Sequence, residues 1–375
     1  MPEASILEQV MGNRREAGKS GAGAWVGWPV WAVGGLMLAL LLGCGERDEP
    51  IADNSGEPAE QTYIIVASIH PLADLASQVT GPGFEVHTLL PAGATPHGFE
   101  PTADKIRLLG RADLILTVGL TLDPWADRAA ATAGRDTPLL SMAEMLDREA
   151  VDAVAGELRE VQINGEFGYD EHEHHDHDHD HDHGHDHDHH DHYHDHDGPD
   201  SHLWIDPVLV KQWVRQLRSE LVTRFPARSD EIERNAAAVL ASLEQLDAEF
   251  REQLAAVPKR ELVTFHNAFD RLANRYGLEV VAHLTDADLE HGAEIRPGRW
   301  RQAVAAVRQY DLKVLYSEPQ FPVRELASIR RETGVEVLTL DPLGHPRREG
   351  YRTYQETMRT NLETLVDGQS RTRYY

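Results

Sequence analysis

Histidine is the residue type in this sequence with the greatest potential for chemistry. The chain has 22 histidines in 375 residues, and 14 of them lie in the segment 170–197. That segment reads DEHEHHDHDHDHDHGHDHDHHDHYHDHD, with ten Asp, two Glu and no Lys or Arg. Imidazoles and carboxylates together bind borderline divalent metals such as zinc, copper and nickel. The segment therefore predicts metal binding without distinguishing among these metals.

We expect segment 170–197 to be a disordered loop, because it has almost no apolar surface whose burial could offset the entropy lost on ordering. Its many ligands favour several loose sites over one fixed site. A low-complexity insert with incidental metal affinity, like a purification tag, is the alternative. The predicted auxiliary ligands are His172, His174, His175, His177, His179, His181, His183, His185, His187, His189, His190, His192, His194 and His196.

Outside this loop, four residues stand where a folded metal site could form. His97 follows a predicted strand in the loop PAGATPHGFEPT, and His266 ends the predicted strand ELVTF. Asp341 follows the predicted strand VEVLTL, and His202 comes shortly after the His-rich loop in DSHLWIDP. In a parallel sheet the carboxyl ends of the strands border the crevice where ligands bind. Three imidazoles and one carboxylate would make a four-coordinate site that suits zinc.

Two further residues could assist such a site. His70 ends the first predicted strand at the same edge of the sheet, so it could contact the metal. Glu318, in SEPQF, ends another predicted strand, and we interpret it as a carboxylate that orients a ligand imidazole. A structural hydrogen bond is the alternative role for Glu318.

Short apolar strands alternate with helical stretches in two parts of the chain, which indicates an α/β fold with two lobes. In the first part we predict strands at 63–69, 85–90 and 114–118 and helices at 71–79 and 102–110. In the second we predict strands at 261–264, 279–283, 314–317 and 335–340 and helices at 266–276 and 299–310. Such alternation is typical of parallel sheets covered by helices. We place the lobes at 62–228 and 258–375.

Residues 229–257 are predicted to form one long helix that joins the lobes. Apolar residues recur every three or four positions from Ile232 to Val257, without Gly or Pro between them, and Ser229 would cap the helix. At about 1.5 Å per residue this helix would be roughly 40 Å long, the diameter of a domain. It could act as a rigid connection with the metal cleft between the lobes. A surface helix within one lobe is the alternative.

The N-terminal residues are predicted to be an export signal. The apolar run 25–42 follows several basic residues and ends in Leu-Leu-Gly-Cys44, which resembles the lipobox of bacterial lipoproteins. In that family the cysteine is lipidated after cleavage, so we assign 1–44 as signal peptide with Cys44 as the lipidation site. A transmembrane anchor is the alternative. Residues 45–61 are polar with Gly and Pro, and we expect a flexible tether.

Composition excludes several classes of protein. The net charge of −27 argues against nucleic-acid binding, which needs a basic surface. Hydrophobic residues make up 41% of the chain, so a wholly disordered protein is excluded. Cys44 is the single cysteine, which rules out an internal disulfide and a cysteine-cluster zinc site.

Four motifs, in this order, resemble those of the metal-specific solute-binding proteins of bacterial ABC importers. They are GATPHGFEPTADKIRLLGRADLILTVG, DSHLWIDPVLV, TFHNAFDRLANRYGL, and SEPQF followed by LDPLG, and the likeness extends roughly from residue 62 to residue 365. The resemblance implies two α/β lobes joined by a long rigid helix, with one metal in the cleft. Carried over by position, the implied ligands are His97, His202, His266 and Asp341.

The third implied ligand resembles the zinc branch of that family. Manganese members usually have a carboxylate there, whereas this chain has His266, and the His-rich loop before the second ligand also resembles zinc members. Two features depart from the family. Some zinc members have a disulfide in the second lobe, which this chain cannot form, and the stretch 285–296 is less like the family's usual acidic, Pro-containing stretch.

The resemblance implies a monomeric, lipid-anchored protein of the periplasm or cell envelope. It would capture zinc(II) and deliver it to an ABC permease that a cytoplasmic ATPase drives. We expect neither catalysis nor nucleic-acid binding. Affinity should fall below about pH 6.5, because imidazoles must be neutral to bind metal. The loop would either raise the local zinc concentration or sense zinc excess. The alternatives are a metal-buffering or adhesin-type lipoprotein and, less favoured, a zinc hydrolase with an open water position.

Overall fold

The computed structural model describes residues 62–152, 200–285, 295–321 and 326–371. The predicted signal with Cys44, the tether and the His-rich loop 170–197 therefore lie outside the described residues. Most of the divergent stretch 285–296 lies outside them as well. Within these four ranges, none of the helices has the length and apolar character needed to cross a bilayer.

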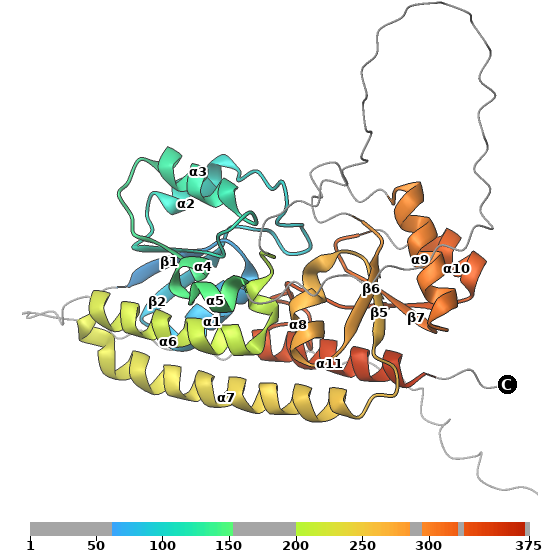
Figure 1. Cartoon of the computed structure of the whole chain (residues 1–375). Helices are drawn as coiled ribbons and strands as arrows, with labels where there is room; N and C mark the ends of the chain where they lie inside the picture. The colour runs from blue at the N-terminus through green and yellow to red at the C-terminus, as the bar shows by residue number, and fades with distance from the viewer. Residues whose placement is uncertain (1–61, 153–199, 286–294, 322–325, 372–375) are drawn as a thin grey trace, which may run out of the picture. The chain divides into compact units, whose positions relative to one another are not determined.

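The first lobe is built on a four-stranded sheet in the order β2-β1-β3-β4, of which Figure 1 labels β1 and β2. All of its neighbouring strands pair in parallel, and Ile65, Val66 and Ala67 in the central strand β1 are fully buried. The elements are β1 (Tyr63–Ala67), α1 (His70–Thr80), β2 (Phe84–Thr88), α2 (Ala103–Leu109), β3 (Leu114–Thr117), α3 (Pro124–Ala133), β4 (Leu139–Ser141), α4 (Met142–Met145) and α5 (Arg148–Asp152).

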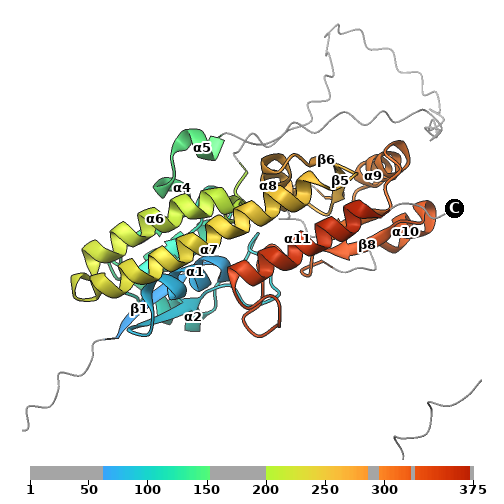
Figure 2. The same ribbon diagram turned by 90° about the horizontal axis from the view of Figure 1, so that it is seen from below.

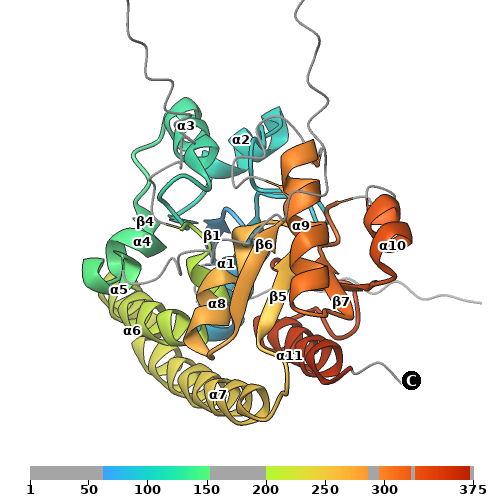
Figure 3. The same cartoon turned by 45° about the vertical axis from the view of Figure 1, so that its right-hand side comes forward.

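The second lobe repeats this arrangement with the strand order β6-β5-β7-β8, again all parallel. Figure 3 shows α9 beside the strands of this sheet. The elements are β5 (Glu261–Thr264), η3 (Asn267–Phe269), α8 (Asp270–Arg275), β6 (Glu279–His283), α9 (Pro297–Gln309), β7 (Val314–Ser317), α10 (Ala327–Thr333), β8 (Glu336–Thr339) and α11 (Tyr354–Ser370). The prediction of two α/β lobes with parallel sheets is confirmed.

The linking helix α7 runs from Ser229 to Ala255, two residues short of its predicted end. Its buried residues follow the predicted apolar stripe: Ile232, Ala236, Val239, Leu243, Leu246, Phe250 and Leu254. The prediction of Ser229 as the N-cap is wrong. The short helix η2 (Pro226–Arg228) continues almost directly into α7, so Arg228 occupies the cap position without a side-chain cap and Ser229 is already helical.

Helix α7 packs against helices from both ends of the chain (Figure 2). It contacts α1, α6 (Pro207–Arg224) and α11. Lys211 in α6 pairs with Asp247 at 3.0 Å, and Arg359 in α11 pairs with Glu249 at 2.8 Å. These two ion pairs join α7 to α6 and to α11 within one helical turn.

Two groups of buried apolar residues stabilise this arrangement. The larger group joins the first sheet, α6, α7, α11 and one face of the second sheet. The smaller group lies between the other face of the second sheet and helices α9 and α10. Adjacent residues of β5 divide between them, Leu262 in the larger and Val263 in the smaller, because successive side chains of a strand point to opposite faces. One face of the second sheet therefore belongs to the same hydrophobic core as the first lobe.

Candidate metal centre

Three imidazoles predicted from widely separated motifs come together in one place. One ring nitrogen from each of His97, His202 and His266 lies within 4.8 Å of the others. The Nε2 atoms of His202 and His266 are 3.2 Å apart. Two ligands held about 2.05 Å from a tetrahedral zinc ion lie about 3.3 Å from each other. The spacing of this pair therefore suits a tetrahedral ion without rearrangement.

His97 reaches the site from the loop between β2 and α2. The loop is fixed to α3 by Trp125, whose indole Nε1 donates to the carbonyl oxygen of Pro96 at 2.8 Å. The Trp125 ring also packs edge-on against Phe99, with ring centroids 4.9 Å apart. This anchor was not predicted, because only the folded chain brings Trp125 next to the loop. Trp125 therefore positions His97 by contacts with the neighbours of His97 in the sequence, and not by a contact with the His97 side chain.

His202 lies just before the short helix η1 (Leu203–Ile205), and a carboxylate fixes its ring. Asp200 Oδ1 accepts hydrogen bonds from the backbone nitrogen of His202 at 3.0 Å and from its Nδ1 at 2.8 Å. With Nδ1 donating to the carboxylate, Nε2 keeps its lone pair for a metal. Burial alone would raise the pKa of Asp200, but the hydrogen bonds from His202 and the charge of Arg271 together hold that pKa below its usual value.

His266 follows β5 and is paired in the same way. Its Nδ1 donates to the carboxylate of Glu318, which follows β7, and both residues are 3% exposed. The arrangement leaves the lone pair of His266 Nε2 directed toward Nε2 of His202. Glu318 is thus placed where an orienting carboxylate would need to be.

The environment of His97 differs from that of the other two imidazoles. Its Nε2 is buried and has no hydrogen-bond partner among the described residues. Burial, together with the neighbouring His202 and His266, lowers the pKa of His97 to about 2. His97 is therefore neutral around pH 7, and a buried nitrogen lone pair without a partner is available to a metal.

The three imidazoles border a small pocket between the lobes. Its lining residues are Thr95, Pro96, His97, His202, Trp204, His266, Glu318, Gln320, Phe321, Pro342 and Leu343. The amide oxygen of Gln320 is buried there without a hydrogen-bond partner in the described part of the chain. Gln320 stands two residues after Glu318 in the motif SEPQF, but nothing in that motif distinguishes it as a polar contact of the site.

The remaining two predicted contacts lie outside the imidazole group in the ranges described. Asp341 follows β8, and its Oδ1 accepts hydrogen bonds from the backbone nitrogens of Leu343 at 3.0 Å and Gly344 at 2.9 Å. Burial raises the pKa of Asp341. His70 begins α1, and its Nε2 contacts the carbonyl oxygen of Arg352 at 3.0 Å.

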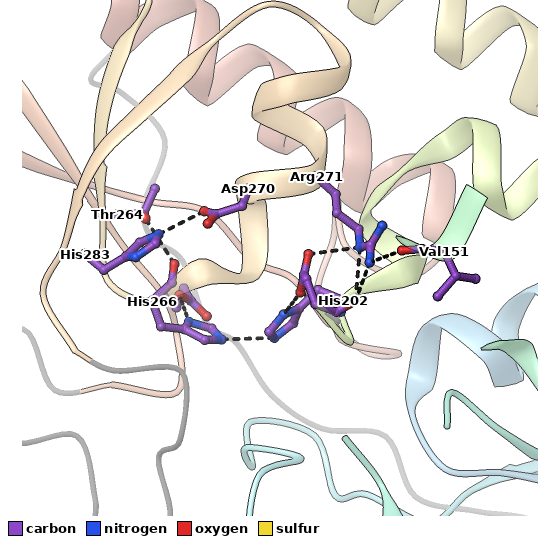
Figure 4. Close-up of polar contacts among 9 residues, drawn as sticks. Val151, His202, Thr264, His266, Asp270, Arg271 and His283 are labelled. Atoms are coloured by element: carbon purple, nitrogen blue, oxygen red, sulfur yellow. Dashed lines mark hydrogen bonds and ion pairs between the residues drawn. The ribbon is translucent and has the colours of Figure 1, made fainter. Parts of the chain in front are cut away.

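Two residues that sequence reasoning missed, Asp200 and Arg271, support His202, and Figure 4 labels Arg271 beside His202. Asp200 stands two positions before His202 in the same motif, so the recurrent pairing of a ligand imidazole with a carboxylate could have identified it. Arg271 in α8 pairs with Asp200 Oδ2 at 3.0 Å. Nothing in the sequence indicates that pairing, because the two residues are 71 positions apart.

Comparison with known proteins adds a family to this geometry. A family model described as "Zinc-uptake complex component A periplasmic" matches residues 65–368. The zinc-binding lipoprotein AdcA of Streptococcus pneumoniae is 26% identical over 321 residues, which cover 84% of this chain. The chain spans only 57% of the length of AdcA.

Other relatives match along nearly their whole length. The high-affinity zinc uptake system protein ZnuA of Bacillus subtilis is 26% identical over 344 residues, covering 91% of this chain and 97% of ZnuA. The manganese-binding lipoprotein MntA of Halalkalibacterium halodurans is 23% identical over 341 residues, covering 89% and 96%. Among solved structures, the periplasmic zinc-binding protein TroA from Treponema pallidum has a similar fold, with a TM-score of 0.64, 20% identity, and coverage of 83% of this chain and 100% of TroA.

Proposed function

The chain belongs to the family of periplasmic A components of zinc-uptake complexes, and we propose that it captures zinc(II) outside the cytoplasmic membrane and delivers it to an ABC-type importer. The observation that carries this proposal is the meeting of ring nitrogens of His97, His202 and His266 within 4.8 Å of one another at one pocket. A third neutral imidazole, whose buried Nε2 has no hydrogen-bond partner in the part of the chain that the structure describes, fits a metal that takes nitrogen ligands.

The donor set decides which metals can compete. Magnesium and calcium prefer oxygen ligands, so three imidazoles discriminate against both. Copper(II) should bind at least as tightly as zinc by the Irving–Williams order. Zinc is favoured over manganese because His266 supplies nitrogen where a carboxylate would suit manganese better. The names of AdcA and ZnuA, which refer to zinc, support this choice.

We propose Asp341 as the fourth ligand on the evidence of its motif alone. In the present structure its Oδ1 holds the turn at Leu343 and Gly344, and both Leu343 and the intervening Pro342 line the pocket. The carboxylate is therefore attached to the wall of the pocket. Replacing it by asparagine tests whether it also binds the ion.

Capture, and not catalysis, is the proposed activity. The matching family is one of uptake-complex components, and a fourth protein ligand would fill the position that a catalytic water needs. Turnover of esters, peptides or phosphates that depends on added zinc would contradict this part of the proposal.

The remaining parts of the proposal concern residues outside the described ranges. Cys44 would carry the lipid anchor, in keeping with the names of AdcA and MntA, and residues 45–61 would tether the lobes to the membrane. The protein would act as a monomer that docks on a membrane permease, whose cytoplasmic ATPase drives transport. The loop 170–197 would raise the zinc concentration near the pocket or sense its excess.

The test is a competitive zinc titration of a soluble form that starts at Gly45, with and without residues 170–197. We expect the loop-deleted form to keep one tight zinc, and His266→Ala to abolish it. His87→Ala is the matched control, because His87 lies in β2 away from the imidazole group. Loss of all tight binding with the loop would instead identify a metal buffer.

A further inference from the structure

Arg271 is a buried cation that links the two lobes next to the imidazole pair. It lies in α8 of the second lobe and is 2% exposed. Its guanidinium donates from Nη2 to the carbonyl oxygen of Asp200 at 2.6 Å and to that of Val151 at 2.8 Å, and its Nε pairs with Asp200 Oδ2 at 3.0 Å. Both acceptors belong to the first lobe. The arginine therefore holds the backbone carbonyl of Asp200 by hydrogen bonds, whereas its pairing with Oδ2 is an ionic contact without hydrogen-bond geometry.

The same segment of chain holds both members of the imidazole pair. His266 stands five residues before Arg271, with only η3 and the start of α8 between them. Asp270, directly before Arg271, accepts a hydrogen bond from His283 Nε2 at 2.9 Å, which fixes the start of α8 to β6 (Figure 4). Segment 266–271 thus carries one ligand directly and reaches the other through Arg271 and Asp200.

We propose that Arg271 is a positioning residue that sets the geometry between His202 and His266. It orders Asp200, whose Oδ1 then fixes the His202 ring, so that one short helix determines how ligands from two lobes face each other. The proposal rests on the zinc-binding function proposed above and extends it. The His202–His266 pair is assembled before the metal arrives, and the metal completes its coordination with His97.

The chemistry of the guanidinium explains why arginine is needed here. Its planar fork donates in fixed directions to several acceptors at once, whereas a lysine ammonium is a point charge on a flexible stem. Without the fork, the carbonyl oxygens of Asp200 and Val151 lose their donors. The Asp200 carboxylate then keeps its hydrogen bonds with His202, but the carboxylate and the ring can turn together, so the direction of the His202 lone pair is less well defined.

The chain offers a matched control one helical turn away. Arg275 is also in α8 and also crosses to the first lobe, where its Nη2 pairs with Asp206 Oδ2 at 2.6 Å. Asp206 caps α6 by accepting from the backbone nitrogen of Val208 at 2.8 Å. Among the hydrogen bonds of the described residues, none joins the Asp206 side chain to the His202 ring. Arg275 therefore reports the general effect of losing an arginine contact between the lobes.

The experiment is a cobalt(II) titration of the full chain in detergent, followed by visible absorption, which reports the coordination geometry. For each variant, the spectrum of the same variant carrying His266→Ala is subtracted, which removes the signal of the His-rich loop. We compare Arg271→Met, Arg271→Lys, Asp200→Asn and Arg275→Met with the unchanged chain. Thermal unfolding without metal measures the structural cost of each substitution.

We expect Arg271→Met to weaken cobalt binding at least tenfold and to change the absorption bands. Arg271→Lys should recover much of the thermal stability but neither the affinity nor the spectrum. Asp200→Asn should give the same altered spectrum as Arg271→Lys, because its amide can still accept from His202 but presents a donor to Arg271. Arg275→Met should lower thermal stability while the spectrum stays unchanged.

The proposal is overturned if Arg271→Lys and Asp200→Asn both keep the original spectrum and affinity, or if Arg275→Met changes the spectrum as much as they do. These two conservative variants decide the matter even if Arg271→Met fails to fold. Failure of the proposed function looks different. In that case the unchanged chain and its His266→Ala variant give identical titrations, so that no difference spectrum exists.

Discussion

The second and third imidazoles of the site are held by a different principle from the first. His202 and His266 each donate Nδ1 to a buried carboxylate, and their Nε2 atoms are already 3.2 Å apart. Within the described ranges, His97 pairs with no such carboxylate, and its loop is anchored by Trp125. The comparison teaches that the pocket consists of a pre-oriented pair and one ligand with more freedom.

The packing of the two lobes also distinguishes the His202–His266 pair from His97. The pair lies where α8 of the second lobe forms hydrogen bonds with residues 200–206 of the first. The helices beneath it belong to the larger group of buried apolar residues, which both lobes share. His97 belongs to a surface loop of the first lobe. A metal can therefore bind the pair first and recruit His97 by a local movement, without any change in the packing of the shared core.

The sharpest test of the comparison replaces each imidazole by alanine in the loop-deleted form. We expect His202→Ala and His266→Ala to weaken zinc binding more than the roughly 10–100-fold typical of a lost supporting contact, because each change removes a ligand from the pre-oriented pair. His97→Ala should cost less than either. Zinc affinity is measured by competition with a chromogenic chelator. Equal losses for all three would break the distinction.

The carboxylates provide the next largest effect. Glu318→Gln and Asp200→Asn should each weaken zinc binding by about 10–100-fold, since a supporting carboxylate fixes the tautomer and orientation of its imidazole. The same competition assay measures both variants. Glu100→Gln is the control, because Glu100 lies on the loop of His97 and its carboxylate contacts the exposed side chain of Arg128. An effect of Glu100→Gln as large as that of Glu318→Gln would contradict the comparison.

Much of this arrangement could be predicted from the sequence, because its signals are local. Strands of four or five apolar residues between helical stretches indicated both sheets, and the three-to-four-residue spacing from Ile232 to Leu254 indicated α7. His97, His202 and His266 each stand in a short motif. The three-residue strand β4 was missed because three residues are too short to show a pattern. Helix α11 was missed because its buried residues include Thr, Asn and Gln as well as apolar ones.

What the sequence could not reveal are contacts between distant positions. Arg271 meets Asp200 across 71 residues, and the anchoring of the His97 loop by Trp125 spans 29 residues. These contacts depend on the packing of α8 and α3, which no spacing rule describes. The position of Asp341 also depends on a tertiary contact, with Asn361 of α11. The backbone nitrogen of Asp341 donates to Asn361 Oδ1 at 2.8 Å, and Asn361 Nδ2 donates to the carbonyl oxygen of Asp341 at 2.7 Å.

Weakening the anchor of His97 should have a smaller effect than changing the carboxylates. Trp125→Phe keeps the ring but removes the hydrogen bond to Pro96, which is worth about 1 kcal/mol. If all of that stabilisation supports the bound position of His97, zinc affinity falls by about fivefold. The measurement is again zinc competition, with a slower association rate expected in stopped flow. A loss as large as that of Glu318→Gln would show that His97 is as tightly organised as the pair.

The acid response of the metal-free protein gives the most specific test of His97. The pKa of His97 is lowered to about 2 in the folded chain, whereas an unfolded histidine has a pKa of about 6.5. Between these values the unfolded state binds one proton more, so stability falls as the pH drops below 6.5. His97→Asn cannot take up that proton and should lose less stability than the unchanged chain between pH 7 and pH 4.5. Urea unfolding in the presence of a chelator measures the difference, with His87→Asn as control. Parallel pH curves for His97→Asn and the unchanged chain would mean that the His97 imidazole is hydrated before metal binds. The loop that carries His97 would then be open to solvent in the metal-free protein.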